Sequence, residues 1–199
     1  MFNVDATSYI SFTPTSLQNS IGKKEATMDV FEAIQNRQSI RGYESTPVPK
    51  EKLNRILEAA RQAPSASNIQ PWHFIVVTDS EKRKKLAEGG RYAKFLVEAP
   101  VVIVGCGDQE ASSKWYTVDV TIALEHMVLT ATSEGLGTCW IGSFDENQVK
   151  ELLRIPENFR VVALLALGYP REKLDVQGNI LKTTRRRKEL EQIVSFEEF

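Results

Sequence analysis

The stretch Arg160-Val161-Val162-Ala163-Leu164-Leu165-Ala166-Leu167-Gly168 decides the fold of this chain. It is apolar at almost every position, whereas a strand with one face in water alternates apolar and polar residues. Three further apolar, β-branched runs lie at 74–78, 100–106 and 138–141. The sequence therefore predicts a central sheet that is covered on both of its faces.

Helical patterns separate these strands. Apolar residues recur with the period of an α-helix at 29–36, 50–62, 80–88, 116–134 and 145–153. The pattern at 116–134 is apolar over more than one face, which indicates a helix in the core or at a subunit interface. The alternation of strands and helices predicts an α/β or α+β architecture with helices on both sides of the sheet.

The composition is that of an ordinary globular domain. The chain has 199 residues, with 25 Lys or Arg against 26 Asp or Glu, so its net charge of -1 provides no basic field for nucleic acid. No apolar run approaches the length of a membrane span, and the two cysteines lack disulfide or zinc spacing. We expect a cytoplasmic protein with one domain over 28–199. Residues 1–27 show no period, and we expect a mobile extension there, or an arm that packs on a partner chain.

Several common catalytic motifs are absent from the sequence. It contains no P-loop, no Gly-x-Gly-x-x-Gly at a helix start and no Gly-x-Ser-x-Gly elbow. With only two histidines, His73 and His126, we expect no catalytic metal site built from protein ligands. Asp119 and His126 lie on one face of the predicted helix 116–134, and we interpret them as a structural polar pair.

Two polar segments suggest ligand binding. Arg37 and Arg41 flank Ser39, and together they would grip a phosphate and a second anionic group, or they would form a solvated helix end. The segment 63–74 places small polar residues between two prolines. Such a segment suits an open loop that lies against a flat ligand, or a polar connection between a helix and a strand.

A basic run at 182–188 is the third polar segment. Runs of this kind are usually solvated tails. Here Leu190, Ile193 and Val194 follow and would anchor the run against the body of the protein.

Together these segments resemble the nitroreductase family of FMN-dependent oxidoreductases, and the resemblance extends from Met28 to about Val194. The most specific piece is Pro64-Ser65-Ala66-Ser67-Asn68-Ile69-Gln70-Pro71-Trp72. The other pieces, in chain order, are Arg37-Gln38-Ser39-Ile40-Arg41, Gly135-Leu136-Gly137-Thr138-Cys139-Trp140-Ile141-Gly142, and the closing basic segment with Leu190-Glu191-Gln192-Ile193-Val194.

The resemblance implies an α+β fold with a central mixed, mostly antiparallel sheet flanked by helices, in an intertwined homodimer with flavin sites at the subunit interface. It implies no catalytic side chain, because the flavin carries the chemistry. The residues that it places at the FMN are Arg37, Gln38, Ser39, Arg41, Pro64, Ser65, Ala66, Ser67, Asn68, Gln70, Trp140, Ile141, Gly142, Ser143, Arg185 and Arg187.

The roles of these residues also follow from the resemblance. Arg37, Ser39, Arg185 and Arg187 would hold the phosphate, and Arg41 would lie beside the pyrimidine edge of the flavin. The loop 64–68 would come from the second subunit. The segment 140–143 would lie along the other edge, with the backbone N–H of Gly142 aimed near the flavin N5.

The implied reaction is a ping-pong hydride transfer. NADH or NADPH reduces FMN and leaves, and an electron-poor acceptor such as a nitroaromatic or a quinone then takes the electrons. An FMN-binding sensor or carrier without turnover would need the same residues and remains an alternative. A nucleic-acid-binding module that relies on 185–188 is a third interpretation.

Overall fold

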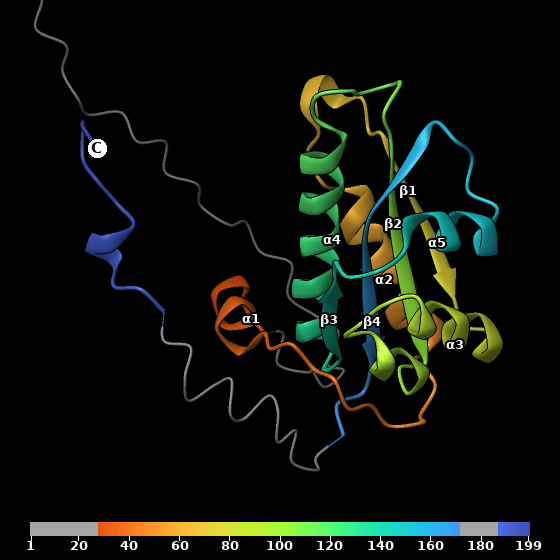
Figure 1. The fold of residues 1–199 in the computed structure, drawn as a ribbon. Coiled ribbons are helices and arrows are strands. Elements are labelled where there is room, and N and C mark those ends of the chain that lie inside the picture. Colours follow the sequence, from red (N-terminus) through yellow and green to blue (C-terminus); the bar gives the residue numbers. More distant parts are fainter. Residues whose placement is uncertain (1–27, 172–186) are drawn as a thin grey trace, which may run out of the picture.

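A four-stranded sheet forms the centre of the protein. The computed structural model describes residues 28–171 and 187–199 (Figure 1). The strands are β1 (Trp72–Val77), β2 (Val101–Asp108), β3 (Gly137–Ile141) and β4 (Phe159–Gly168), in the order β1-β2-β4-β3. Each neighbouring pair is antiparallel, and a parallel bridge joins Ser39 to Thr138 at the β3 edge. The expected α+β fold with a mostly antiparallel sheet is confirmed.

Five α-helices and three short 3-10 turns complete the described chain. The α-helices are α1 (Val30–Asn36), α2 (Lys50–Arg61), α3 (Ser80–Glu88), α4 (Tyr116–Ser133) and α5 (Glu146–Leu153). The 3-10 turns are η1 (Ala66–Asn68), η2 (Lys94–Val97) and η3 (Leu190–Gln192). Every predicted helix and strand is present and differs from its prediction only at the ends. The predicted extension 1–27 lies outside the described residues, and no helix within them is long and apolar enough to cross a membrane.

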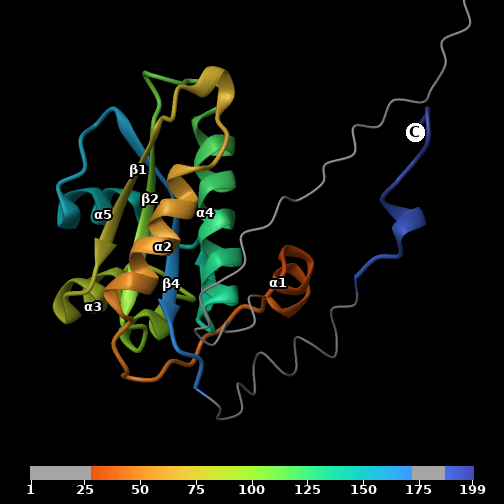
Figure 2. The same cartoon turned by 180° about the vertical axis from the view of Figure 1, so that it is seen from behind.

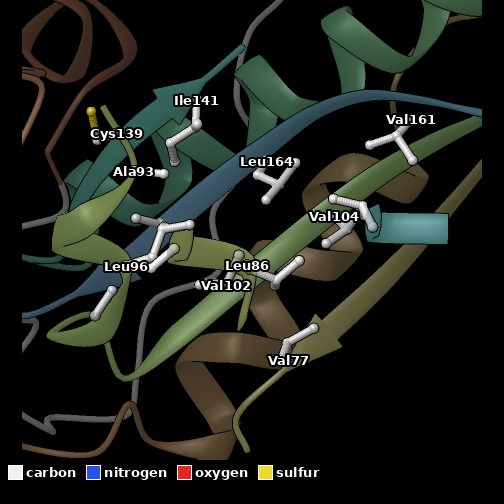
Figure 3. Close-up of a cluster of buried hydrophobic side chains, with 14 of the residues drawn as sticks. Val77, Leu86, Ala93, Leu96, Val102, Val104, Cys139, Ile141, Val161 and Leu164 are labelled. Carbon is white, nitrogen blue, oxygen red and sulfur yellow. The ribbon is translucent and has the colours of Figure 1, made fainter. Parts of the chain in front are cut away.

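Both faces of the sheet are buried, as the apolar strands predict. In β2, Val102 and Val104 face a core built with α3, η2 and α5, whereas Val101 and Ile103 face a second core built with α2 and α4. Figure 3 shows the first of these cores, with Leu86 and neighbouring side chains packed on the sheet. Because both faces of β2 pack against buried cores, neither face carries polar side chains, and the run 101–104 is continuously apolar.

Glycines on β2 let α4 approach the sheet closely. A Cβ added at Gly105 would lie 2.8 Å from Leu124 Cδ1, and one added at Gly107 would lie 2.6 Å from Tyr116 Cδ2. These two glycines therefore serve the packing of the core. The strand β4 carries a bulge opposite this region, where the register shifts between Gly105 and Cys106.

The first helix does not bury its apolar side chains in a single copy. Val30, Phe31 and Ile34 are 72%, 66% and 50% exposed, and only Ala33 of α1 is buried. The helix stands beside α4, away from the sheet (Figures 1 and 2). The apolar face predicted from the sequence is present, but within the described residues nothing covers it.

Candidate functional site

The segment 37–41 is fixed by the edge of the sheet. Helix α1 starts with a capping box between Asp29 and Glu32, and the backbone of Arg37 turns extended to end it. Ser39 then bridges Thr138 at the start of β3, and the N–H of Ile40 donates to the Thr138 carbonyl oxygen at 2.8 Å. These contacts tie the arginine-rich segment to a strand far along the chain.

Side-chain packing and a buried hydrogen bond also hold the segment 37–41 in place. Ile40 lies against Gly137, where an added Cβ would come within 2.6 Å of its Cγ1. The hydroxyl of Tyr43 is buried and donates to the Ile40 carbonyl oxygen at 2.6 Å. Burial raises the pKa of Tyr43 well above its ordinary value of 10.0, so the phenol stays protonated and keeps this donor role.

The two guanidiniums of this segment are available to an anion. Neither Arg37 nor Arg41 forms an ion pair with a carboxylate of the described residues. Ser39 and Gln38 are exposed, and both arginines are half-buried. A hydroxyl and two unpaired guanidiniums on a fixed backbone are suited to a phosphate and a second electron-rich group.

The segment 140–143 lies at the other end of the same strand. Thr138 and Gly142 are four residues apart, which in a strand corresponds to about 13 Å. Ile141 is buried, so only its backbone can meet a ligand, whereas Gly142 and Ser143 are exposed. Apart from its chain neighbours, no heavy atom lies within 4 Å of a Cβ placed on Gly142. The space beside Gly142 is open in one copy, so any need for glycine there must come from a ligand or a second chain.

A turn that the sequence analysis did not consider supports this segment. The Asp145 N–H donates to the Gly89 carbonyl oxygen at 3.0 Å, and a Cβ on Gly90 would lie 2.2 Å from the Ser143 carbonyl oxygen. The glycine pair 89–90 is the signal that would have revealed it. Lys94 is exposed in η2.

The loop 64–70 lies at the start of α4. The backbone N–H of Ala66 donates to the Asp119 carboxylate Oδ1 at 3.1 Å, and Ser65 Oγ accepts from the Gln70 N–H at 2.9 Å. The Gln70 side chain donates to both oxygens of Asn68, the backbone carbonyl and Oδ1. Ser65 and Ala66 are half-buried, and Pro64, Ser67, Asn68 and Gln70 are exposed to solvent.

Within one copy, the loop 64–70 and the segment 37–41 lie at opposite ends of α4 (Figures 1 and 2). That helix has 18 residues and is therefore about 27 Å long. The structure thus joins 37–41 to the start of the strand that leads into 140–143, and it leaves the loop 64–70 at the other end of α4 from 37–41.

The closing basic segment is only partly described. Arg185 lies outside the described residues, and Arg187 is exposed. Leu190, Ile193 and Val194 are exposed as well, so the expectation that they anchor the segment to the body of the same copy is wrong. Both views show the described end of the chain standing clear of the sheet.

Three other polar or nucleophilic residues have structural roles. Asp119 bonds to Ala66, and His126 Nδ1 lies 3.2 Å from the Ala59 carbonyl oxygen, so their interpretation as a pair with each other is wrong. Burial raises the pKa of the Cys106 thiol to about 12, which leaves it without thiolate character near neutral pH. No group of three or more metal-ligating side chains is found among residues 28–171 and 187–199.

Comparison with known proteins identifies the family. The profile of the Nitroreductase family matches residues 34–91 and 87–169. A nitroreductase family protein of Clostridium novyi NT is 39% identical, with a TM-score of 0.70 over 73% of this chain and 87% of that one. An FMN-dependent nitroreductase of Clostridium difficile R20291 is 32% identical, with a TM-score of 0.71 over 84% of this chain and 98% of that one.

A curated relative agrees with these structures. The FMN reductase [NAD(P)H] of Bacillus subtilis is 30% identical over 167 residues, which cover 73% of this chain and 67% of the relative. The family profile spans most of the described body, and the solved structures share its fold at more than 30% identity. The chain therefore belongs to the nitroreductase family.

Proposed function

We propose that this protein is an FMN-dependent NAD(P)H oxidoreductase that passes electrons to an electron-poor small molecule such as a nitroaromatic or a quinone. One observation carries the proposal. A segment bridged to the start of β3 carries two guanidiniums that form no ion pair with a described carboxylate, and an open glycine lies just past the end of the same strand. Relatives named as an FMN reductase [NAD(P)H] and an NADPH-flavin oxidoreductase support the same activity.

The start of β3 suits the phosphate of FMN. The hydroxyl of Ser39 and the guanidinium of Arg37 would donate charge-assisted hydrogen bonds to its oxygens, and no described carboxylate competes for Arg37. Arg185 and Arg187, brought from the end of the chain, would add further positive charge.

The end of β3 suits the flavin ring. The open space beside Gly142 allows the ring edge to approach the backbone, and Trp140, Ile141 and Ser143 extend that edge. Arg41 would lie near the pyrimidine side, where its positive charge favours the negative charge of the reduced ring. When bound, FMN supplies the hydride chemistry, since it accepts a hydride from a nicotinamide and gives electrons to an acceptor.

We infer that two copies build each site. The loop 64–70 and the arginine segment lie at opposite ends of α4, which is about 27 Å long, so the loop does not reach a phosphate held by Arg37 of the same copy. Val30, Phe31 and Ile34 on α1 are exposed, and a groove of about 400 Å³ runs between α1 and α4. Exposed apolar surface of this extent fits a homodimer in which the partner's loop completes the site.

The absorption spectrum of the purified protein tests the cofactor. We expect a yellow protein that releases stoichiometric FMN on denaturation and that oxidises NADH or NADPH when a quinone or nitroaromatic is added. A colourless protein that cannot be reconstituted with FMN would overturn the proposal. Bound FMN without steady-state turnover would favour a sensor or carrier instead.

A further inference from the structure

The loop 64–70 has an unusual backbone for a segment without glycine. Ser67, Asn68 and Gln70 have φ angles of 51°, 56° and 55°, in the left-handed region that favours glycine. Three such residues within four positions are disfavoured on their own and persist only where the surroundings fix them. Because most of the loop is exposed, only a small number of residues can make the contacts that hold this backbone conformation.

Asp119 provides the anchor of this loop on the body of the protein. Its side chain is in the first turn of α4 and only 3% exposed, and its Oδ1 accepts the hydrogen bond from the Ala66 N–H. This hydrogen bond joins Ala66, the residue just before the three residues with positive φ, to helix α4. Within the loop, Ser65 Oγ accepts a hydrogen bond from the Gln70 N–H, and this bond spans the left-handed stretch.

Only one of the two carboxylate oxygens of Asp119 has a hydrogen-bond partner among the described residues. The second oxygen, Asp119 Oδ2, is buried and has no hydrogen-bond partner among the described residues. A buried carboxylate oxygen without a partner is unfavourable, so the folded chain would be served as well or better by an uncharged acceptor. The atom through which Asp119 holds the loop is therefore Oδ1, which accepts from the Ala66 N–H.

We propose that Asp119 is a positioning residue, which presets the loop 64–70 in its left-handed conformation for a flavin ring bound by the partner copy. The proposal rests on the proposed function for the identity of the ligand. Asp119 acts through the acceptor atom that it offers to the Ala66 N–H, and the placement of that atom matters more than its charge. A preset loop binds a ligand more tightly because less ordering is needed on binding.

Three variants of the full-length protein separate placement from charge. Asp119→Asn keeps an oxygen at the position of Oδ1 and removes the charge. Asp119→Glu keeps the charge and moves the oxygens by one methylene, and Asp119→Ala removes the acceptor. Asp79→Ala is the matched control, because Asp79 Oδ1 accepts a comparable backbone hydrogen bond from Lys82, at 2.8 Å, at the start of α3.

Two readouts are measured for each variant: amide hydrogen exchange of residues 66–70 in the flavin-free protein, and the Kd for FMN. We expect Asp119→Ala and Asp119→Glu to speed exchange in the loop and to weaken FMN binding about tenfold, as the loss of one well-placed hydrogen bond would do. Asp119→Asn should stay within about threefold of the wild type in both, and Asp79→Ala should change neither.

The possible results are distinct. Exchange in the loop that is the same in Asp119→Ala as in the wild type would overturn the positioning role, as would a Glu variant that matches or exceeds the Asn variant. If Asp119→Ala does not fold, the comparison of Asp119→Asn with Asp119→Glu in the two readouts still tests the positioning role. A wild-type protein that binds no FMN would refute the proposed function only, because the exchange measurement does not depend on flavin.

Discussion

Ser39 and Thr138 form a parallel bridge, and the adjoining N–H of Ile40 donates to the Thr138 carbonyl oxygen at 2.8 Å. The bridge joins the segment after α1 to the first residues of β3. It thereby sets the distance between the two arginines and Gly142, which lies just beyond the other end of the same strand. The candidate site is built along this strand, and the following predictions test its parts.

Removing the guanidinium of Arg37 should weaken FMN binding. A charge-assisted hydrogen bond contributes about 1.5–3 kcal/mol, so Arg37→Ala should raise the Kd by at least about tenfold, as measured by flavin fluorescence titration. Arg61→Ala is the control, because Arg61 is an exposed arginine whose carboxylate partner, Glu58, lies on its own helix. An equal loss in both variants would show that overall charge, not the site, attracts the phosphate.

Two glycine substitutions should separate ligand contact from core packing. Gly142→Ala should leave the unfolding midpoint of the flavin-free protein unchanged, since its Cβ meets nothing, but should weaken FMN binding. Gly105→Ala should destabilise the fold by about 1–3 kcal/mol in urea unfolding, because its Cβ would lie 2.8 Å from Leu124. A Gly142→Ala variant with normal FMN affinity would place the ring elsewhere.

Mixing two defective variants should restore activity if the sites are shared between copies. Arg37→Ala damages the arginine side of a site, and Asn68→Ala damages the loop side. A mixed dimer then contains one doubly damaged site and one intact site, so random exchange of subunits should return about a quarter of the wild-type activity.

The activity of that mixture is measured after denaturing and refolding the two variants together. Each variant refolded alone is the control, and at an FMN concentration that saturates the wild type but not the variants both should show less activity than the mixture. Sites confined to single chains would give no recovery on mixing, and this result would contradict the two-copy arrangement.

The acid stability of the protein should depend in part on Glu146. Hydrogen bonds from Arg160 at 2.8 and 2.6 Å, with one from the Val161 N–H at 3.0 Å, hold the pKa of Glu146 below its ordinary value of 4.5. A folded-state pKa below the unfolded one stabilises the protein above about pH 4.5, and this stabilisation is lost as the pH falls through the folded value.

The variant Glu146→Gln tests this linkage. The wild type should exceed it by about 1 kcal/mol in free energy of unfolding at pH 7, since the ion pair is partly exposed. The difference should shrink as the pH falls below about 4.5, in urea titrations at each pH. A difference that stays constant with pH would mean that Glu146 contributes through packing alone.

Much of the fold was predictable because its signals are local. The continuous apolar runs of β2 and β4 predicted strands buried on both faces, and the helical periods predicted α1 to α5. The sheet order β1-β2-β4-β3 was not predictable from these signals, because strand pairing depends on contacts between distant segments. Nor did periodicity show that the apolar face of α1 stays uncovered in one copy.

The candidate site was predictable in its residues but not in its arrangement. Arg37, Ser39 and Gly142 were identified from short motifs, and the structure bridges the segment of the first two to the start of β3 and places Gly142 just past its end. Asp119 was interpreted as the partner of His126, whereas its partner is the backbone of Ala66. A hydrogen bond to a backbone N–H leaves no mark in the identity of the partner residue, so the sequence carried no signal for it.

By itself, the sequence determined which segments become strands and helices and which residue types are offered to a phosphate and a flat ring, because backbone periodicity and side-chain chemistry are properties of the chain. Only the tertiary structure decided which of these segments meet. It bridged 37–41 to the start of the strand that leads into 140–143, and it held the loop 64–70 at the other end of α4 from 37–41. Within one copy a helix about 27 Å long separates the loop from the segment 37–41, and this separation, together with the exposed apolar face of α1, is why we assign the completed site to two copies.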